Sequence, residues 1–103
     1  MAVIPIENLE KRKLRELVDE ICQTAKKNRV VCLKFTREDD FYNYLGTRKE
    51  EMPIMSSEAI QRLKESPNHE SSEAYIVKNL IIERGLNLRE IEYHKDLEVI
   101  YRF

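Results

Sequence analysis

The chain has 103 residues, of which 42% are hydrophobic and 36% are charged, and its net charge is −1. This length fits one domain, and the composition is typical of a folded, soluble protein rather than a disordered chain. The isoelectric point of about 6.2 argues against avid, non-specific binding of nucleic acid. No stretch reaches the roughly 20 apolar residues that a membrane-spanning helix needs, and MAVIPI at the start is too short for a signal peptide. We therefore expect a cytoplasmic protein.

The two cysteines, Cys22 and Cys32, each lie within an apolar stretch. A zinc site needs about four ligands at close spacing, and a small secreted protein needs more cysteines to build a disulfide framework. The sequence therefore predicts two free, buried thiols, no metal site and no other cofactor.

The first predicted element is a helix over residues 8–28. Its apolar side chains recur at steps of three and four residues, which places them along one stripe; they are Leu14, Leu17, Val18, Ile21, Cys22 and Ala25. Asn8 is the predicted N-cap, and Asn28 is the predicted left-handed residue at the C-terminus. The stretch RVVCLKF, residues 29–35, follows directly and predicts a buried strand because it is rich in apolar and β-branched residues.

A second helix is predicted in the acidic stretch REDDFYNYLG, residues 37–46. Thr36 and Asp39 have the spacing of a capping box, and carboxylates are favoured in the first turn of a helix. Gly46 is expected to end the helix. Three apolar residues fall on one face of this helix: Phe41, Tyr44 and Leu45.

The remaining residues predict two more helices and a pair of strands. The helices cover residues 56–65 and 73–86, the second of them ending at Gly85, and a loop over residues 66–72 separates them. Residues 88–103 alternate between polar and apolar, which predicts two strands joined at HKD. The apolar faces of these strands carry Ile91 and Tyr93, and then Leu97, Val99, Tyr101 and Phe103.

We therefore expect one α+β domain over residues 1–103, with residues 37–69 as a candidate insertion. Its predicted core is a small three-stranded, largely antiparallel sheet. The two long helices, 8–28 and 73–86, are expected on one face of that sheet, and short helices in the middle insertion.

The chain contains none of the motifs that mark phosphate-binding loops, nucleophile elbows or zinc proteases. An active site would have to use His69 or the pair Asp39 and Asp40, and each has a structural explanation, in a turn or at a helix start. We therefore expect no enzymatic activity, and an uncharacterised small enzyme is the least favoured alternative.

Basic residues gather at both ends of the first predicted helix. Those at its end, Lys26, Lys27 and Arg29, are favoured by the negative end of the helix dipole, whereas cations at its start are slightly unfavourable. The residues at the start are therefore the better candidates for contact with an anionic partner. The predicted nucleic-acid-binding set is Lys11, Arg12, Lys13, Lys78, Arg84 and Arg89.

Two tyrosines, Tyr42 and Tyr75, fall off the apolar stripes of their helices, which favours a place in a protein interface. Ile76 and Ile82 add apolar residues to the helix over 73–86 beyond its main stripe. If they are exposed, they offer a patch that a symmetric dimer could bury. These four residues are the predicted interface.

Residues 14–35 and 70–103 resemble the R-three-H domain, a small module that binds single-stranded nucleic acid. The stretches that carry the resemblance are LRELVDEICQTAKKNRVVCLKF and SSEAYIVKNLIIERGLNLREIEYHKDLEVIYRF, with the order helix, strand, helix ending in GL, strand, strand. The family is named for an Arg and a His separated by three residues, and those positions fall on Ala74 and Lys78 here. The resemblance implies this fold more than this function. A winged helix, with the last two strands as the wing, is a second match in layout.

Besides the enzyme alternative, the sequence supports two functions. The favoured one is a small non-enzymatic interaction or regulatory protein that binds another protein or itself, as a homodimer. The alternative is a module that binds single-stranded nucleic acid with a basic patch, whose binding would weaken as salt rises. Neither involves a membrane.

Overall fold

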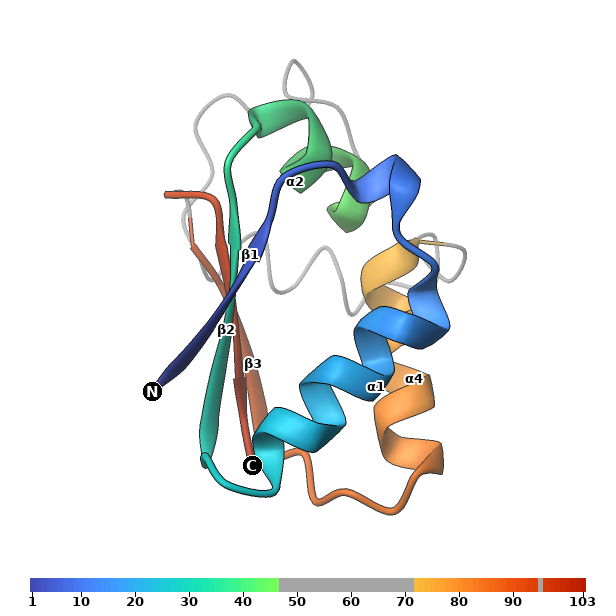
Figure 1. The fold of residues 1–103 in the computed structure, drawn as a ribbon, viewed down its shortest axis with the longest axis vertical. Helices are drawn as coiled ribbons and strands as arrows, with labels where there is room; N and C mark the ends of the chain where they lie inside the picture. Colours follow the sequence, from blue (N-terminus) through green and yellow to red (C-terminus); the bar gives the residue numbers. More distant parts are fainter. Residues whose placement is uncertain (47–71, 95) are drawn as a thin grey trace.

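The computed structural model describes residues 1–46, 72–94 and 96–103 of the chain. These residues form an α+β fold in which helices cover one face of a mixed sheet (Figure 1). In chain order the elements are β1 (Ala2–Ile6), the short 3₁₀ helix η1 (Leu9–Lys11), α1 (Leu14–Ala25), β2 (Val30–Phe35), α2 (Glu38–Leu45), α4 (Glu73–Glu83), β3 (Glu90–His94) and β4 (Glu98–Arg102).

The sheet has four strands in the order β1-β2-β4-β3. β1 runs parallel to β2, whereas β4 is antiparallel to both of its neighbours, β2 and β3. The α+β class and the two long helices, α1 and α4, on one face are confirmed (Figure 1). The three predicted strands are β2, β4 and β3, and they pair antiparallel, but the predicted number of strands was wrong, because β1 adds a fourth strand parallel to β2 and makes the sheet mixed.

Strand β1 lies at one edge of the sheet and was not predicted. Its inward side chains, Ile4 and Ile6, are buried, whereas Val3 is 51% exposed. The Ile6 carbonyl accepts a hydrogen bond from the Thr36 backbone N–H at 3.1 Å, so it points towards β2. The backbone N–H and C=O groups of successive residues point to opposite sides of a strand, so the backbone nitrogen of Pro5 points to the free edge of the sheet. Proline is tolerated there, and because it has no N–H to donate, it prevents another chain from pairing with this edge.

The core lies between the inner face of the sheet and the helices. The sheet contributes Val31, Leu33 and Phe35 from β2, Val99 and Tyr101 from β4, and Ile91 and Tyr93 from β3. The helices contribute Leu17, Val18, Ile21, Phe41, Tyr44, Leu45, Val77 and Ile81, all at most 1% exposed. The predicted apolar faces of these elements are thus confirmed.

The predicted helix over residues 8–28 is two shorter pieces. Asn8 precedes the one-turn η1, with no hydrogen bond from its side chain, and α1 begins after Lys13. The helix α1 ends at Ala25, and Asn28 does not take the predicted left-handed conformation, since Leu97 is the only non-glycine residue of positive φ in the described chain.

Helix α2 begins one residue later than the capping-box prediction. The residue at its N-cap is Arg37, and Thr36 instead donates a hydrogen bond from Oγ1 to the Ile6 carbonyl at 3.3 Å. The prediction of a capping box was therefore wrong, because the Thr36 hydroxyl is hydrogen-bonded to β1 and does not cap α2. Gly46 follows the helix with φ of 78°, which confirms its role as a left-handed C-cap.

Helix α4 is capped by Ser72, whose hydroxyl accepts a hydrogen bond from the Tyr75 N–H at 3.2 Å. It ends at Glu83, and Gly85 follows with φ of 80°, as predicted. Leu97 is not part of the predicted strand, since it lies in the turn before β4 with φ of 67°. The helix predicted over residues 56–65 lies outside the described residues, as does the loop predicted over 66–72 except for its last residue, Ser72.

Both cysteines are free and buried, as predicted. The Cys32 thiol donates a hydrogen bond to Glu98 at 3.2 Å, and burial together with this carboxylate raises the pKa of the thiol to about 12. Cys32 is therefore protonated and unreactive near neutral pH. Among the described helices, none has the length and apolarity needed to cross a membrane.

Candidate functional site

Three segments of the chain meet at one end of the sheet. Because β4 is antiparallel to both neighbours, its last residues lie beside the first residues of β2 and β3, and Arg102 pairs with both Val30 and Glu90. The ladder extends one residue further. The Phe103 N–H donates to the Arg29 carbonyl at 2.8 Å, and the Arg89 N–H donates to the Arg102 carbonyl at 2.7 Å.

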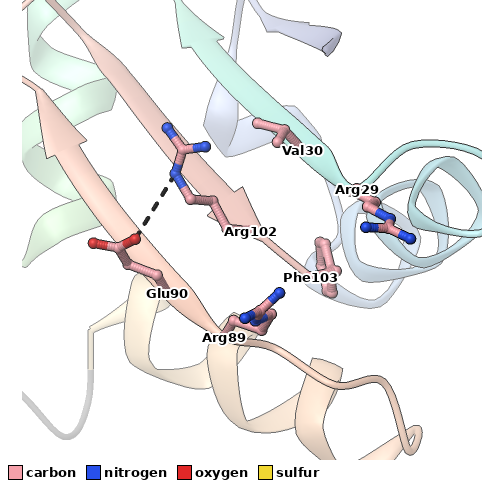
Figure 2. A pocket seen from close by; sticks show the side chains of 6 residues that line it. All are labelled: Arg29, Val30, Arg89, Glu90, Arg102 and Phe103. Carbon is pink, nitrogen blue, oxygen red and sulfur yellow. Dashed lines mark ion pairs between the residues drawn. The ribbon is translucent and has the colours of Figure 1, made fainter.

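Side chains alternate between the faces of a strand, so this pairing sorts the residues at the sheet end into two rows. Arg29, Phe103 and Arg89 form one row, on the same face as buried Tyr101, two residues before Phe103. Arg102 lies on the opposite face with Glu90. Figure 2 shows the Phe103 ring between the Arg29 and Arg89 side chains.

These residues line an open cavity of about 620 Å³ (Figure 2). Its lining consists of Arg29, Val30, Arg89, Glu90, Arg102 and Phe103. Arg29 and Arg89 border this cavity from one face of the sheet, and the ion-paired Arg102 and Glu90 border it from the other face. Ligand sites are usually concave, with a few polar or charged groups that orient the ligand.

The three arginines differ in whether they have acidic partners. Arg102 pairs with Glu90 at 3.8 Å and with Glu92 at 3.2 Å, and its hydrogen bond is the main reason that the pKa of Glu92 is lowered. Arg29 and Arg89 are exposed, and within the described part of the chain neither side chain has an ion-pair partner. These two guanidinium groups are therefore available to an anion.

Further basic residues lie at the same end of the molecule. Lys26 and Lys27 are exposed just after α1, which ends beside the start of β2 (Figure 1). Arg84 follows α4 at this end as well, but it forms an ion pair with Asp19, which raises the pKa of its guanidinium. Together with the cavity, the exposed lysines form a basic end of the molecule. We call Lys26, Lys27, Arg29, Arg89 and Arg102 the basic end.

The structure does not bring the predicted nucleic-acid-binding residues together. Lys11 ends η1 and Lys13 precedes α1, a helix of 12 residues, so these two exposed lysines lie roughly 20 Å from the basic end. Arg12 forms an ion pair with Glu20, and the Lys78 ammonium lies 5.9 Å from the centre of the Tyr75 ring.

Of the predicted set, only Arg89 lines the cavity. Sequence reasoning missed Arg29 and Arg102 as members of a site. Arg29 was explained by the end of a helix and Arg102 was not singled out, and only the strand order shows that they meet.

The predicted interface residues lie on different sides of their helices. Ile82 is 50% exposed and Ile76 is 37% exposed. At about 100° per residue, Tyr75 and Ile82 are only about 20° apart around α4, whereas Ile76 and Ile82 are about 120° apart. Ile82 and partly buried Tyr75 therefore share a stripe, and Ile76 is separate from it. Tyr42 is partly buried and its ring packs 5.4 Å from that of Phe41.

The residues considered for catalysis do not form a reactive set in the described chain. Asp39 is exposed, whereas Asp40 is 5% exposed and its Oδ2 atom has no hydrogen-bond partner. Burial, and then the nearby Asp40, raise the pKa of Glu73. His69 lies outside the described residues. Within the described ranges, no group of three or more His, Cys, Asp or Glu residues could hold a metal ion.

The cavity at the basic end is thus the candidate site that the geometry defines best. Comparison of the chain with protein-family models, with curated protein sequences and with solved structures finds no match.

Proposed function

We propose that the chain is a non-enzymatic module that binds single-stranded nucleic acid through its basic end. One observation carries the proposal: Arg29 and Arg89 line one cavity, and neither has an acidic partner among the described residues. A planar guanidinium binds phosphate groups well, because two parallel N–H donors match two phosphate oxygens.

The chemistry of the lining supports binding rather than catalysis. An arginine stays protonated at all ordinary pH values, so it holds an anion but cannot act as a general base. The acidic residue of the lining, Glu90, is paired with Arg102. The cavity can therefore orient a phosphate-bearing chain, while the exposed Lys26 and Lys27 extend the positive surface along which that chain could continue.

The resemblance to the R-three-H domain supports the proposal only through the order of the elements. Its two signature positions do not form the site here, because Ala74 is buried in the core and Lys78 lies against Tyr75. The proposal therefore moves the nucleic-acid contact from α4 and the start of α1 to the end of the sheet.

Reversing the two unpaired charges is expected to weaken binding of a labelled single-stranded oligonucleotide by about tenfold or more. The variant is Arg29→Glu with Arg89→Glu, and the control is Lys11→Glu with Lys13→Glu, which changes the net charge equally at the other end of α1. Each phosphate contact with a single strand contributes about −0.7 to the slope of log affinity against log salt. Loss of two contacts should therefore flatten that slope by about 1.4.

Fluorescence anisotropy over a salt series measures both quantities. An equal loss of affinity in the two variants would mean that binding depends only on net charge and that the cavity is not the binding site. A greater loss of affinity in the Lys11 and Lys13 variant would favour the binding site predicted from the sequence, which includes these two lysines.

Protein binding is the second candidate function, favoured by the stripe on α4 that carries Tyr75 and half-exposed Ile82. Exposed apolar residues beside an aromatic ring are typical of interface centres. A second copy of the chain would bury this stripe in a symmetric dimer.

Ile82→Asp is expected to leave the free energy of unfolding within about 0.5 kcal/mol of wild type, since the side chain is half exposed. If the α4 stripe joins two copies, light scattering will show a dimer in the wild type and a monomer in this variant. Ile76→Asp, on a different side of α4, is the matched control and should remain dimeric. A wild-type monomer at high concentration would remove self-association from the candidates.

A further inference from the structure

We infer that Phe103 is a stacking platform for one unpaired base, held between Arg29 and Arg89, which bind the phosphates on either side of that nucleotide. The inference rests on the proposed function and assigns to Phe103 the selection of single strands over duplexes. Phosphate contacts alone carry little selectivity for the state of the bases, because every nucleic acid has a phosphate backbone.

The register of the sheet places the ring between the two cations. Arg29 precedes β2, Phe103 follows β4 and Arg89 precedes β3, and backbone hydrogen bonds of 2.8 and 2.7 Å hold the three segments side by side. Neighbouring strands are about 4.8 Å apart, so the two arginine backbones lie roughly 10 Å apart with the phenylalanine midway.

The ring has both a fixed side and an accessible side. Phe103 is partly buried and packs against the hydrophobic core, yet it also lines the cavity. Packing against the core restricts the side chain before a ligand arrives, so less conformational entropy is lost on binding. An aromatic ring fixed in this way beside cationic side chains is the usual platform in proteins that bind single strands.

The position of the ring explains why a single strand is favoured. In a duplex the faces of each base are covered by its neighbours, so a ring inside a cavity can stack only on a base that has left the helix. The ring offers no hydrogen-bonding group, so the platform should accept any base, with modest preferences set by stacking strength.

The experiment compares two labelled oligonucleotides of about ten residues with the same number of phosphates, one carrying bases and one abasic throughout. Wild-type protein is expected to bind the base-containing strand about tenfold more tightly at low salt, which is within the range for stacking of one base. Phe103→Leu removes the ring but retains apolar volume, and it should bind both strands with the weaker affinity. Phe103→Tyr keeps the ring and should retain the preference.

The outcomes separate this inference from the proposed function. Equal binding of both strands by the wild type, or a preference that survives in Phe103→Leu, overturns the role of the ring but leaves the phosphate contacts standing. Absence of binding to either strand at low salt overturns the proposed function and the inference with it. A thermal melt of each variant checks folding, and if Phe103→Leu does not fold, the wild-type comparison of the two strands still decides the role of base stacking.

Discussion

Replacement of Ile6 by alanine is expected to lower the free energy of unfolding by about 2–5 kcal/mol, the usual cost of truncating a large buried aliphatic side chain. Ile6 is fully buried on the inner face of β1, and its carbonyl accepts hydrogen bonds from Thr36 at the end of β2. The truncation leaves a cavity between the edge strand and the helices. Denaturation by urea, followed by circular dichroism, measures the change.

Val3→Ala is the matched control, since Val3 lies on the same strand but is 51% exposed. Its effect should stay within about 0.5 kcal/mol. If Ile6→Ala costs no more than Val3→Ala, β1 does not form part of the core, and the sheet has three strands as the sequence pattern predicted.

The β1 strand shows which kind of element a local sequence pattern cannot predict. Helix α1 and strand β2 repeat their apolar residues often enough to be predicted, whereas β1 has five residues, two of them buried, and a proline. Proline normally counts against a strand, and only at an edge does it cease to do so. Whether a strand lies at an edge depends on the order of strands in the sheet. That order is set by contacts between residues that are far apart in the sequence, so no local sequence pattern indicates it.

The capping residues illustrate the same limit at smaller scale. Ser72 and Gly46 were open to prediction because their roles depend on neighbours within a few residues. Thr36 had the right spacing for a cap at α2, but its hydroxyl donates to Ile6, thirty residues earlier. A long-range contact thus replaced the local one.

The candidate site was the least accessible feature, for a geometric reason. Arg29 and Phe103 are at distant points of the chain and become neighbours only because β4 runs antiparallel between β2 and β3. Arg89 alone was selected from sequence, as one member of a basic set. Two others in that set form ion pairs, Arg12 with Glu20 and Arg84 with Asp19, and the exposed Lys11 and Lys13 lie at the far end of α1.

A second large effect on the free energy of unfolding is expected at a buried pair of tyrosines. The hydroxyl groups of Tyr44 on α2 and Tyr101 on β4 are hydrogen-bonded to each other, and both rings are fully buried. Burial raises the pKa of both hydroxyls well above the usual value, so both are protonated at neutral pH. Tyr44→Phe removes one hydroxyl from this pair and leaves the other in the core with its bond to Tyr44 lost.

We expect Tyr44→Phe to lower the free energy of unfolding by about 1–3 kcal/mol, because the remaining hydroxyl keeps the cost of its desolvation. Tyr101→Phe should have a similar effect. The double variant, with both changes, should lose less than the sum of the two, because no hydroxyl of the pair is then left behind. Tyr75→Phe, on a partly exposed ring, is the control and should be nearly neutral. Additive losses in the double variant would mean that the two hydroxyls act independently, and that the link between α2 and the sheet comes from ring packing, such as the contact of Tyr44 with Phe35 at 5.3 Å.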